Sequence, residues 1–265
     1  MNELFELHML GGPTERRYRK LRPEVEAMPW GTIDPSRHSP ELVLAARRSW
    51  TLAAFQEHRT GAACAEALHA LIAARAPLDL IAIATRFPLD ELAHVEMCAR
   101  ITAELGGGVP IEHDATDLVH RVDRSLPPLL GAAELVVRFF CVGEAISVPL
   151  LRGTWHAARH PLMRAVLGRI VRDEAAHGQF GWTFLDWAEP ELGRDERAHL
   201  ARAARETIDA LAEGWIEIEP RPDIAGEELG ALGWMETEPY LALARRTLDT
   251  HVLRPLRARG IDPGR

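Results

Sequence analysis

A motif that occurs twice is the part of this sequence best suited to chemistry. Residues 90–94 and residues 173–177 both read Asp-Glu-x-x-His. Because residues three apart lie on one face of a helix, the glutamate and the histidine of each copy point the same way. A carboxylate and an imidazole on one face form half of a metal site. Two such halves, with one further carboxylate from each of two other helices, would form a dinuclear site inside a four-helix bundle.

The surrounding sequence predicts the helices that such a site requires. Helical patterning extends over residues 40–75, 78–105, 131–159, 162–188, 191–215 and 236–258. Proline breaks the pattern at Ala76-Pro77 and at His160-Pro161, and a long polar crossover occupies residues 109–129. No segment alternates with period two over a sustained run, so we expect an all-α protein.

The order of these elements is hairpin, long crossover, hairpin, and each motif falls on the second helix of its hairpin. We expect three regions in the chain. Residues 1–37 form an irregular N-terminal arm, residues 38–188 form the dimetal bundle, and residues 189–265 form a C-terminal helical extension packed on the bundle. The first helix of each hairpin must then supply the missing carboxylate at the height of the motif.

Glu144 fits this requirement in the second hairpin. It lies about as far before the turn near residue 160 as Glu174 lies after it, and it is the only charged residue in 139–151. An ionised carboxylate in such an apolar setting is costly unless it is paired or bound to a metal. The alternative is a salt bridge to a core arginine, and we favour metal ligation.

Two glutamates, Glu57 and Glu66, are candidates in the first hairpin. They are nine residues apart, which is roughly 180° around a helix, so both cannot face the core. Glu57 precedes Glu144 by about the same interval that separates the two motifs, and small residues lie one turn either side of it. We therefore favour Glu57 and leave Glu66 as the alternative.

The predicted ligand set has a definite chemical character. It consists of four carboxylates and two imidazoles: Glu57, Glu91, His94, Glu144, Glu174 and His177. Such a site without thiolates favours iron or manganese over iron–sulfur clusters and structural zinc. Asp90 and Asp173 lie about 100° off the ligand face, where each can accept the outer N–H of an imidazole from a neighbouring helix.

These residues together resemble the ferritin-like di-iron carboxylate superfamily, whose members include ferritins, rubrerythrins, ribonucleotide reductase small subunits and multicomponent monooxygenases. The resemblance covers roughly residues 40–188. It implies a ferritin-like four-helix bundle that binds two iron ions, with manganese or a mixed manganese–iron pair as alternatives. It also implies an oxidase or oxygenase that uses O₂ to oxidise or hydroxylate a small organic substrate, with an external electron donor of the ferredoxin or flavin reductase type.

Other functions of this fold are less well supported. Ferroxidase or peroxide-scavenging activity is the main alternative, although the four-cysteine iron module of rubrerythrins is absent from the sequence. A radical-generating subunit needs a tyrosine near the metals, and the only tyrosines, Tyr18 and Tyr240, lie outside the predicted bundle. A tRNA-modifying hydroxylase is opposed by the net charge of −8, because phosphate binding needs a basic surface.

Two expectations concern the substrate. We predict an apolar pocket lined by small and apolar residues near the ligands: Ala53, Ala54, Gly61, Phe140, Val148 and Leu151. The N-terminal arm and the C-terminal helices would cover it. Four arginines are candidates for binding an anionic substrate, with surface salt bridges as the simpler assignment: Arg59, Arg86, Arg138 and Arg152.

Composition places few further limits. The 47% hydrophobic and 26% charged content is that of an ordinary globular protein. The three cysteines lie far apart, which suits a reducing compartment, and we expect a cytoplasmic protein. No uninterrupted apolar run reaches the length of a membrane span. The architecture would allow a homodimer.

Overall fold

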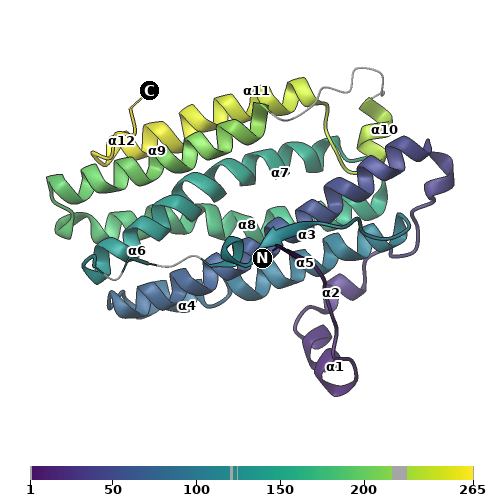
Figure 1. Cartoon of the computed structure of the whole chain (residues 1–265), viewed down its shortest axis with the longest axis horizontal. Coiled ribbons are helices and arrows are strands. Elements are labelled where there is room, and N and C mark those ends of the chain that lie inside the picture. The colour runs from purple at the N-terminus through teal and green to yellow at the C-terminus, as the bar shows by residue number, and fades with distance from the viewer. Residues whose placement is uncertain (1, 120–121, 124, 217–225, 265) are drawn as a thin grey trace.

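The computed structural model describes residues 2–119, 122–123, 125–216 and 226–264, and this part of the chain is helical apart from one small sheet (Figure 1). The helices of the body are α3 (Pro40–Ala73), α4 (Leu78–Ala84), α5 (Phe87–Glu104), α6 (Pro128–Val136), α7 (Ala145–Ala157), α8 (Pro161–Ala188), α9 (Arg194–Ile216), α10 (Gly226–Ala231), α11 (Thr237–Thr247) and α12 (Arg254–Ala258). Short 3₁₀ turns lie at Pro35–Arg37, Ala115–Leu118 and Glu189–Glu191.

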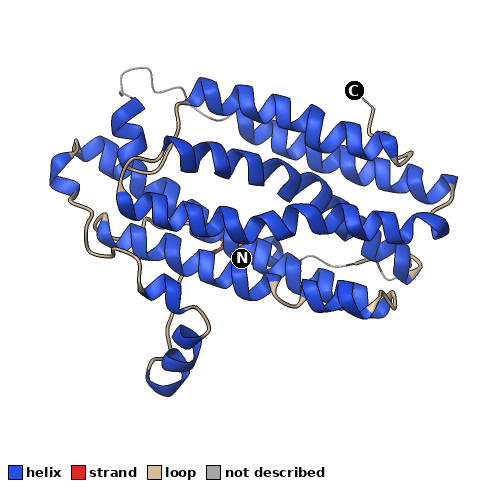
Figure 2. Cartoon of the chain, turned by 180° about the vertical axis from the view of Figure 1, so that it is seen from behind, coloured by secondary structure: helices blue, strands red, loops and turns tan. Residues whose placement is uncertain are grey.

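Two helical hairpins form the centre of the molecule. Helix α3 packs along α5, α7 packs along α8, and the hairpins meet through contacts of α5 with α8 and of α3 with α6. The C-terminal helices add a further layer, in which α11 lies along α7 and α9 packs against the segment before α7 (Figure 2). Each Asp-Glu-x-x-His motif therefore lies on the second helix of a hairpin.

Three of the predicted helices are interrupted, 78–105, 131–159 and 236–258. The expected helix 78–105 is divided into α4 and α5, because Pro88 lacks the N–H that would bond to the carbonyl of Ala84. The expected helix 131–159 contains a π-helix, η3 (Val137–Glu144), between α6 and α7. A second π-helix, η5 (Leu248–Leu253), joins α11 to α12. The π-helix η3 ends at Glu144, so this irregularity helps to aim a predicted ligand.

The N-terminal arm contains regular structure that the sequence did not predict. Strand β1 (Asn2–Leu4) pairs antiparallel with β2 (Glu112–Asp114) from the crossover, and three-residue strands are too short to show alternation. Two short helices follow, α1 (Gly12–Lys20) and α2 (Pro23–Glu26). Figure 1 shows α1 projecting away from the helical body. The arm is attached to α5 by a 3.2 Å hydrogen bond from the Tyr18 hydroxyl to the Leu92 carbonyl.

The core consists of two apolar clusters, and the polar motif residues lie between them. On α8, Ile170 belongs to one cluster and Phe180 to the other. On α5, Met97 belongs to the same cluster as Ile170, and Phe87 belongs to the same cluster as Phe180. A layer of acidic and histidine side chains thus lies between two apolar clusters, one on each side along the helices. No helix in the described part of the chain is both long and apolar enough to cross a membrane.

Candidate metal centre

The six predicted ligands come together in the middle of the two hairpins, and we call them the carboxylate–histidine cluster. They form two overlapping groups, in each of which one oxygen or nitrogen per residue lies within 4.8 Å of the others. One group is Glu57, Glu91, His94 and Glu174; the other is Glu91, Glu144, Glu174 and His177. Glu91 and Glu174 belong to both groups.

The imidazoles lie on opposite sides of the two shared carboxylates. His94 Nδ1 is 3.1 Å from Glu174 Oε1 and 3.6 Å from Glu91 Oε2. His177 Nδ1 is 2.9 Å from Glu174 Oε2 and 3.0 Å from Glu91 Oε1. Each shared carboxylate therefore directs one oxygen toward each histidine.

The first hairpin contributes Glu57 and not Glu66 to this cluster. Glu57 Oε2 lies 3.5 Å from His94 Nδ1, whereas Glu66 is in neither group. Gly61, one turn after Glu57, faces Glu91, and a Cβ placed there would lie 3.3 Å from Glu91 Cβ. The small residue lets α3 approach α5 closely enough for Glu57 to reach the motif. In the second hairpin, Glu144 is buried and its Oε2 accepts a 2.8 Å hydrogen bond from Ser147 Oγ.

The aspartates of the motifs support the histidines crosswise. His94 Nε2 lies 3.3 Å from Oδ2 of Asp173, which belongs to the other motif. His177 Nε2 lies 3.8 Å from Oδ2 of Asp90. An aspartate behind Nε2 favours the tautomer that carries its proton there, which leaves the Nδ1 lone pair free for a metal. The contact between His94 and Asp173 has the form that the sequence predicted, whereas Asp90 lies beyond hydrogen-bond distance of His177.

Two arginines lie behind the aspartates: Arg169, which the sequence did not single out, and Arg86, which it offered only as an anion site or a surface salt bridge. Arg86 Nε lies 2.9 Å from Asp90 Oδ2, and its Nη2 lies 3.4 Å from Asp173 Oδ1. Arg169 Nε lies 2.6 Å from Asp173 Oδ2. Each arginine precedes its aspartate by four residues, so the repeat is Arg-x-x-x-Asp-Glu-x-x-His. That longer repeat was visible in the sequence and would have identified both arginines.

Without metal, the cluster reduces its charge by taking up protons. Desolvation raises the pKa of Glu57 to about 8. Desolvation also holds the pKa of Glu144 well above its usual range, and the nearby carboxylates add to the effect. Desolvation lowers the pKa of His177, but Asp90 and Glu174 outweigh it and raise that pKa to about 12. Cations that bind here would replace these protons.

Burial and the neighbouring charges act in opposite directions on the pKa values of Glu174 and His94. Burial raises the pKa of Glu174, but the adjacent imidazoles of His177 and His94 outweigh it and leave the pKa below its usual range. Burial lowers the pKa of His94, yet Asp173 and Glu174 hold it well above its usual range. Glu174 is thus an ionised carboxylate at neutral pH, ready to bind cations.

The cluster fits a pair of divalent cations. Within the described part of the chain, several of its buried polar atoms have no hydrogen-bond partner, namely both carboxylate oxygens of Glu91, Oε2 of Glu174, Nδ1 of His94 and both ring nitrogens of His177. Unpartnered buried polar atoms are costly in a folded protein. Two divalent ions carry four positive charges, which equals the charge of the four carboxylates in the cluster. Bound ions would therefore satisfy both the orphaned atoms and the charge.

No protein-family model, curated protein or solved structure matches this chain.

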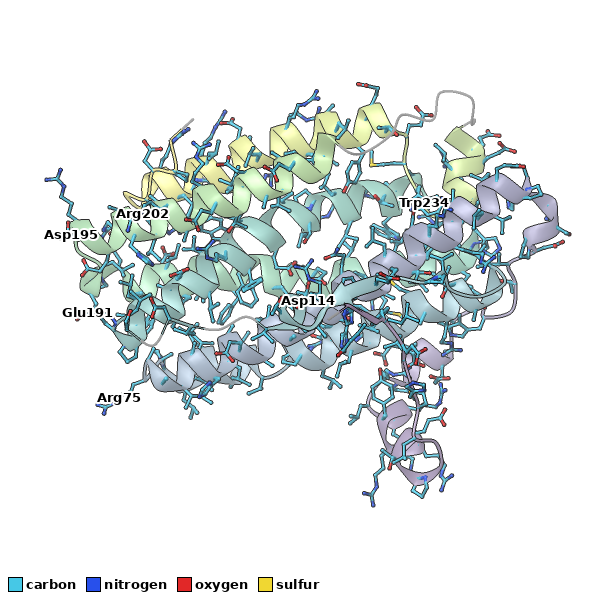
Figure 3. The ribbon with its side chains drawn as sticks, in the orientation of Figure 1. Arg75, Asp114, Glu191, Asp195, Arg202 and Trp234 are labelled. Atoms are coloured by element: carbon cyan, nitrogen blue, oxygen red, sulfur yellow. The ribbon has the colours of Figure 1, made fainter. Side chains whose placement is uncertain are left out.

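A cavity of about 530 Å³ reaches the cluster from one side, where Glu57, Glu144 and Glu174 form part of its wall. Of the six residues predicted to line the pocket, Ala53 and Leu151 lie on this wall. The other four are not found on the described part of the wall: Ala54, Gly61, Phe140 and Val148. The C-terminal helices form part of the wall as expected, through Leu211, Trp215 and Tyr240. Trp234, labelled in Figure 3, lies near the meeting of α10 and α3.

One expectation about the surroundings of the pocket was wrong. The described part of the N-terminal arm contributes no residue to the wall of the cavity, because the arm packs on α5 and α8, where Glu24 pairs with Arg169. Tyr240 lies outside the two hairpins, as predicted, and α11 places it on the wall of the cavity.

Replacing Asp173 by asparagine is expected to weaken metal binding by about 10- to 100-fold, because His94 would lose the carboxylate that holds its tautomer. Metal affinity measured by competition with a chromophoric chelator would check this. Asp186→Asn is the matched control, since Asp186 lies on the same helix and pairs with Arg259 on the surface. Equal affinities of the two variants would contradict the assigned role of Asp173.

Proposed function

We propose that this chain is a ferritin-like di-iron protein that uses O₂ to oxidise or hydroxylate a small organic molecule. The observation that carries the proposal is that Glu91 and Glu174 belong to both ligand groups. Shared carboxylates support a pair of adjacent ions. A ligand set of oxygen and nitrogen donors without sulfur favours iron or manganese.

The four helices that hold the ligands support the ferritin-like part of the proposal. Their order along the chain is α3, α5, the α6–η3–α7 segment and α8, with a long crossover between the hairpins. Each of the first helices brings one glutamate and each of the second helices brings a Glu-x-x-His pair, which is the ligand pattern of di-iron carboxylate bundles.

The cavity favours substrate oxidation over iron storage. It lies beside the cluster, on the side where Glu57 and Glu144 are exposed to it. A bound iron pair would supply the electrons that reduce O₂, and an external reductase would restore them. The chain itself holds the ions through the six ligands, fixes the imidazoles through Asp90 and Asp173, and keeps a substrate within reach in an apolar enclosure.

Iron binding and O₂ reactivity test this proposal together. The purified protein is expected to bind two ferrous ions per chain and to give a transient visible absorbance when mixed with O₂ in a stopped-flow instrument. Glu144→Ala should lose one ion, because Glu144 belongs to only one group. Glu66→Ala is the control and should retain both.

Two outcomes would count against the proposal. Formation of a mineral with many irons per chain would instead support the ferroxidase alternative. Stoichiometric zinc in the purified protein, combined with no reaction of the iron-loaded protein with O₂, would exclude the oxygenase assignment.

A further inference from the structure

The wall of the cavity beside the carboxylate–histidine cluster is mainly hydrocarbon and aromatic ring. Five aromatic side chains from separate segments contribute to it: Trp50, Phe139, Trp215, Trp234 and Tyr240. Aliphatic residues such as Ile146, Leu150 and Leu167 fill the spaces between them. A flat ring would bind such a wall most favourably, because contacts between aromatic rings stabilise the complex beyond the contribution of the buried apolar area.

Three of the hydroxyl groups on the wall are hydrogen-bonded within the protein. The Thr60 hydroxyl donates to the Gln56 carbonyl, and the Thr154 hydroxyl donates to the Leu150 carbonyl, both within their own helices. Ser147 donates to Glu144. These three hydroxyls are therefore not free to donate to a ligand, and a strongly polar molecule bound beside them would lose hydrogen bonds to water that they do not replace.

The charges on the wall are carboxylates that the metals would neutralise. The charged residues among the described lining side chains are Glu57, Glu144 and Glu174, all of them cluster members. Lysine, arginine and histidine are not found among those lining residues. With two divalent ions bound, the four carboxylates of the cluster are balanced, so neither an anionic nor a cationic ligand would find an unpaired counter-ion.

The arginines considered as anion sites lie outside the described wall of the cavity. Arg86 pairs with Asp90 and Asp173, and Arg138 pairs with Glu134 and Glu206. Arg59 and Arg152 are also outside the described wall of the cavity. The described residues thus provide no clamp for a carboxylate or phosphate group.

We propose that the cavity selects an uncharged aromatic molecule and presents its ring to the carboxylate–histidine cluster. This inference rests on the proposed function and names the class of its substrate. The volume of about 530 Å³ is within the range of pockets that enclose drug-sized ligands, so the molecule can carry more than one ring.

Three probes with the same ring and different charge test the proposal: naphthamide, naphthoate and naphthylmethylammonium. Binding is measured by calorimetry and by quenching of tryptophan fluorescence, because three tryptophans lie on the wall. In protein loaded anaerobically with ferrous iron, naphthamide should bind at least about tenfold more tightly than either charged probe.

A variant that adds a positive charge to the wall provides an independent test. Leu151→Arg places a cation on the wall and should shift the preference of the loaded protein toward naphthoate by about tenfold or more. Leu52→Arg is its matched control, because Leu52 is an exposed leucine of α3 outside the described wall, and it should bind the probes as the unchanged protein does. Circular dichroism establishes that both variants fold.

The outcomes separate this inference from the proposed function. Iron-loaded protein that binds naphthoate or naphthylmethylammonium as tightly as naphthamide would overturn the substrate class, whatever its reaction with O₂. Failure to bind two ferrous ions would instead overturn the proposed function, and the metal content measured on the same samples shows which of the two has failed.

Discussion

Replacing Glu91 by alanine is expected to remove both metal ions, with affinity for each falling by at least about 100-fold. Glu91 belongs to both ligand groups, and its side chain is fully buried between the two histidines. Its loss would leave each remaining group with three ligands and would break the bridge between the ions. Metal content after dialysis, measured by mass spectrometry, would decline from two ions per chain to nearly none.

Two further variants test whether the loss of both ions from Glu91→Ala is due to its membership in both ligand groups. Glu174→Ala should have the same double effect, because Glu174 is the other shared ligand. Glu57→Ala, which affects one group only, should retain one ion. A Glu91→Ala protein that keeps one tightly bound ion would contradict the bridging assignment, provided that its helix content is unchanged.

Replacing Gly181 by alanine is expected to lower the free energy of unfolding by about 1–3 kcal/mol, which corresponds to a fall in Tm of roughly 2–12 °C. A Cβ at this position would lie 2.7 Å from Cys141 Sγ, 2.9 Å from Phe140 Cβ and 3.1 Å from the Cys141 backbone nitrogen. Rotation of a side chain cannot relieve the last two contacts, so α8 and the π-helix would have to move apart.

The movement would also affect the metal centre, because the same π-helix ends at Glu144. Thermal unfolding of the metal-free protein isolates the packing effect from metal binding. Gly214→Ala is the matched control, since Gly214 lies within α9 and a Cβ there would have nothing within 4 Å. That variant should be unchanged or slightly more stable, because alanine favours helix over glycine. Equal losses of stability in the two variants would contradict the close-packing explanation.

Much of the cluster could be predicted because its residues break the local pattern of the sequence. Glu144 is a lone charge in an apolar helix, and Glu57 was preferred to Glu66 because its spacing from Glu144 repeats the spacing of the motifs. The structure places Glu57 and Glu144 in the cluster. Apolar periodicity likewise located the main helices to within a few residues.

Other features depend on forces that local patterns do not record. A π-helix shifts the hydrogen-bond register without changing which residues are apolar, so η3 could not be distinguished from an α-helix. The cavity is built by distant segments, and Phe140, predicted to line it, instead packs against Phe87 and Phe180. Which residues face the cavity depends on the side of the bundle against which the C-terminal helices pack. Tertiary contacts determine that side, and local sequence patterns do not contain them.

The crossed support of the two histidines has a consequence for the origin of the chain. Each motif supplies the aspartate behind the imidazole of the other motif, and both bridging glutamates serve both imidazoles. A single hairpin with one motif would contain neither the partner for its own histidine nor the second half of the centre. Such an ancestor could complete the centre only by pairing with another copy of itself. Duplication and fusion of its gene would then join in one polypeptide two halves that already depended on each other.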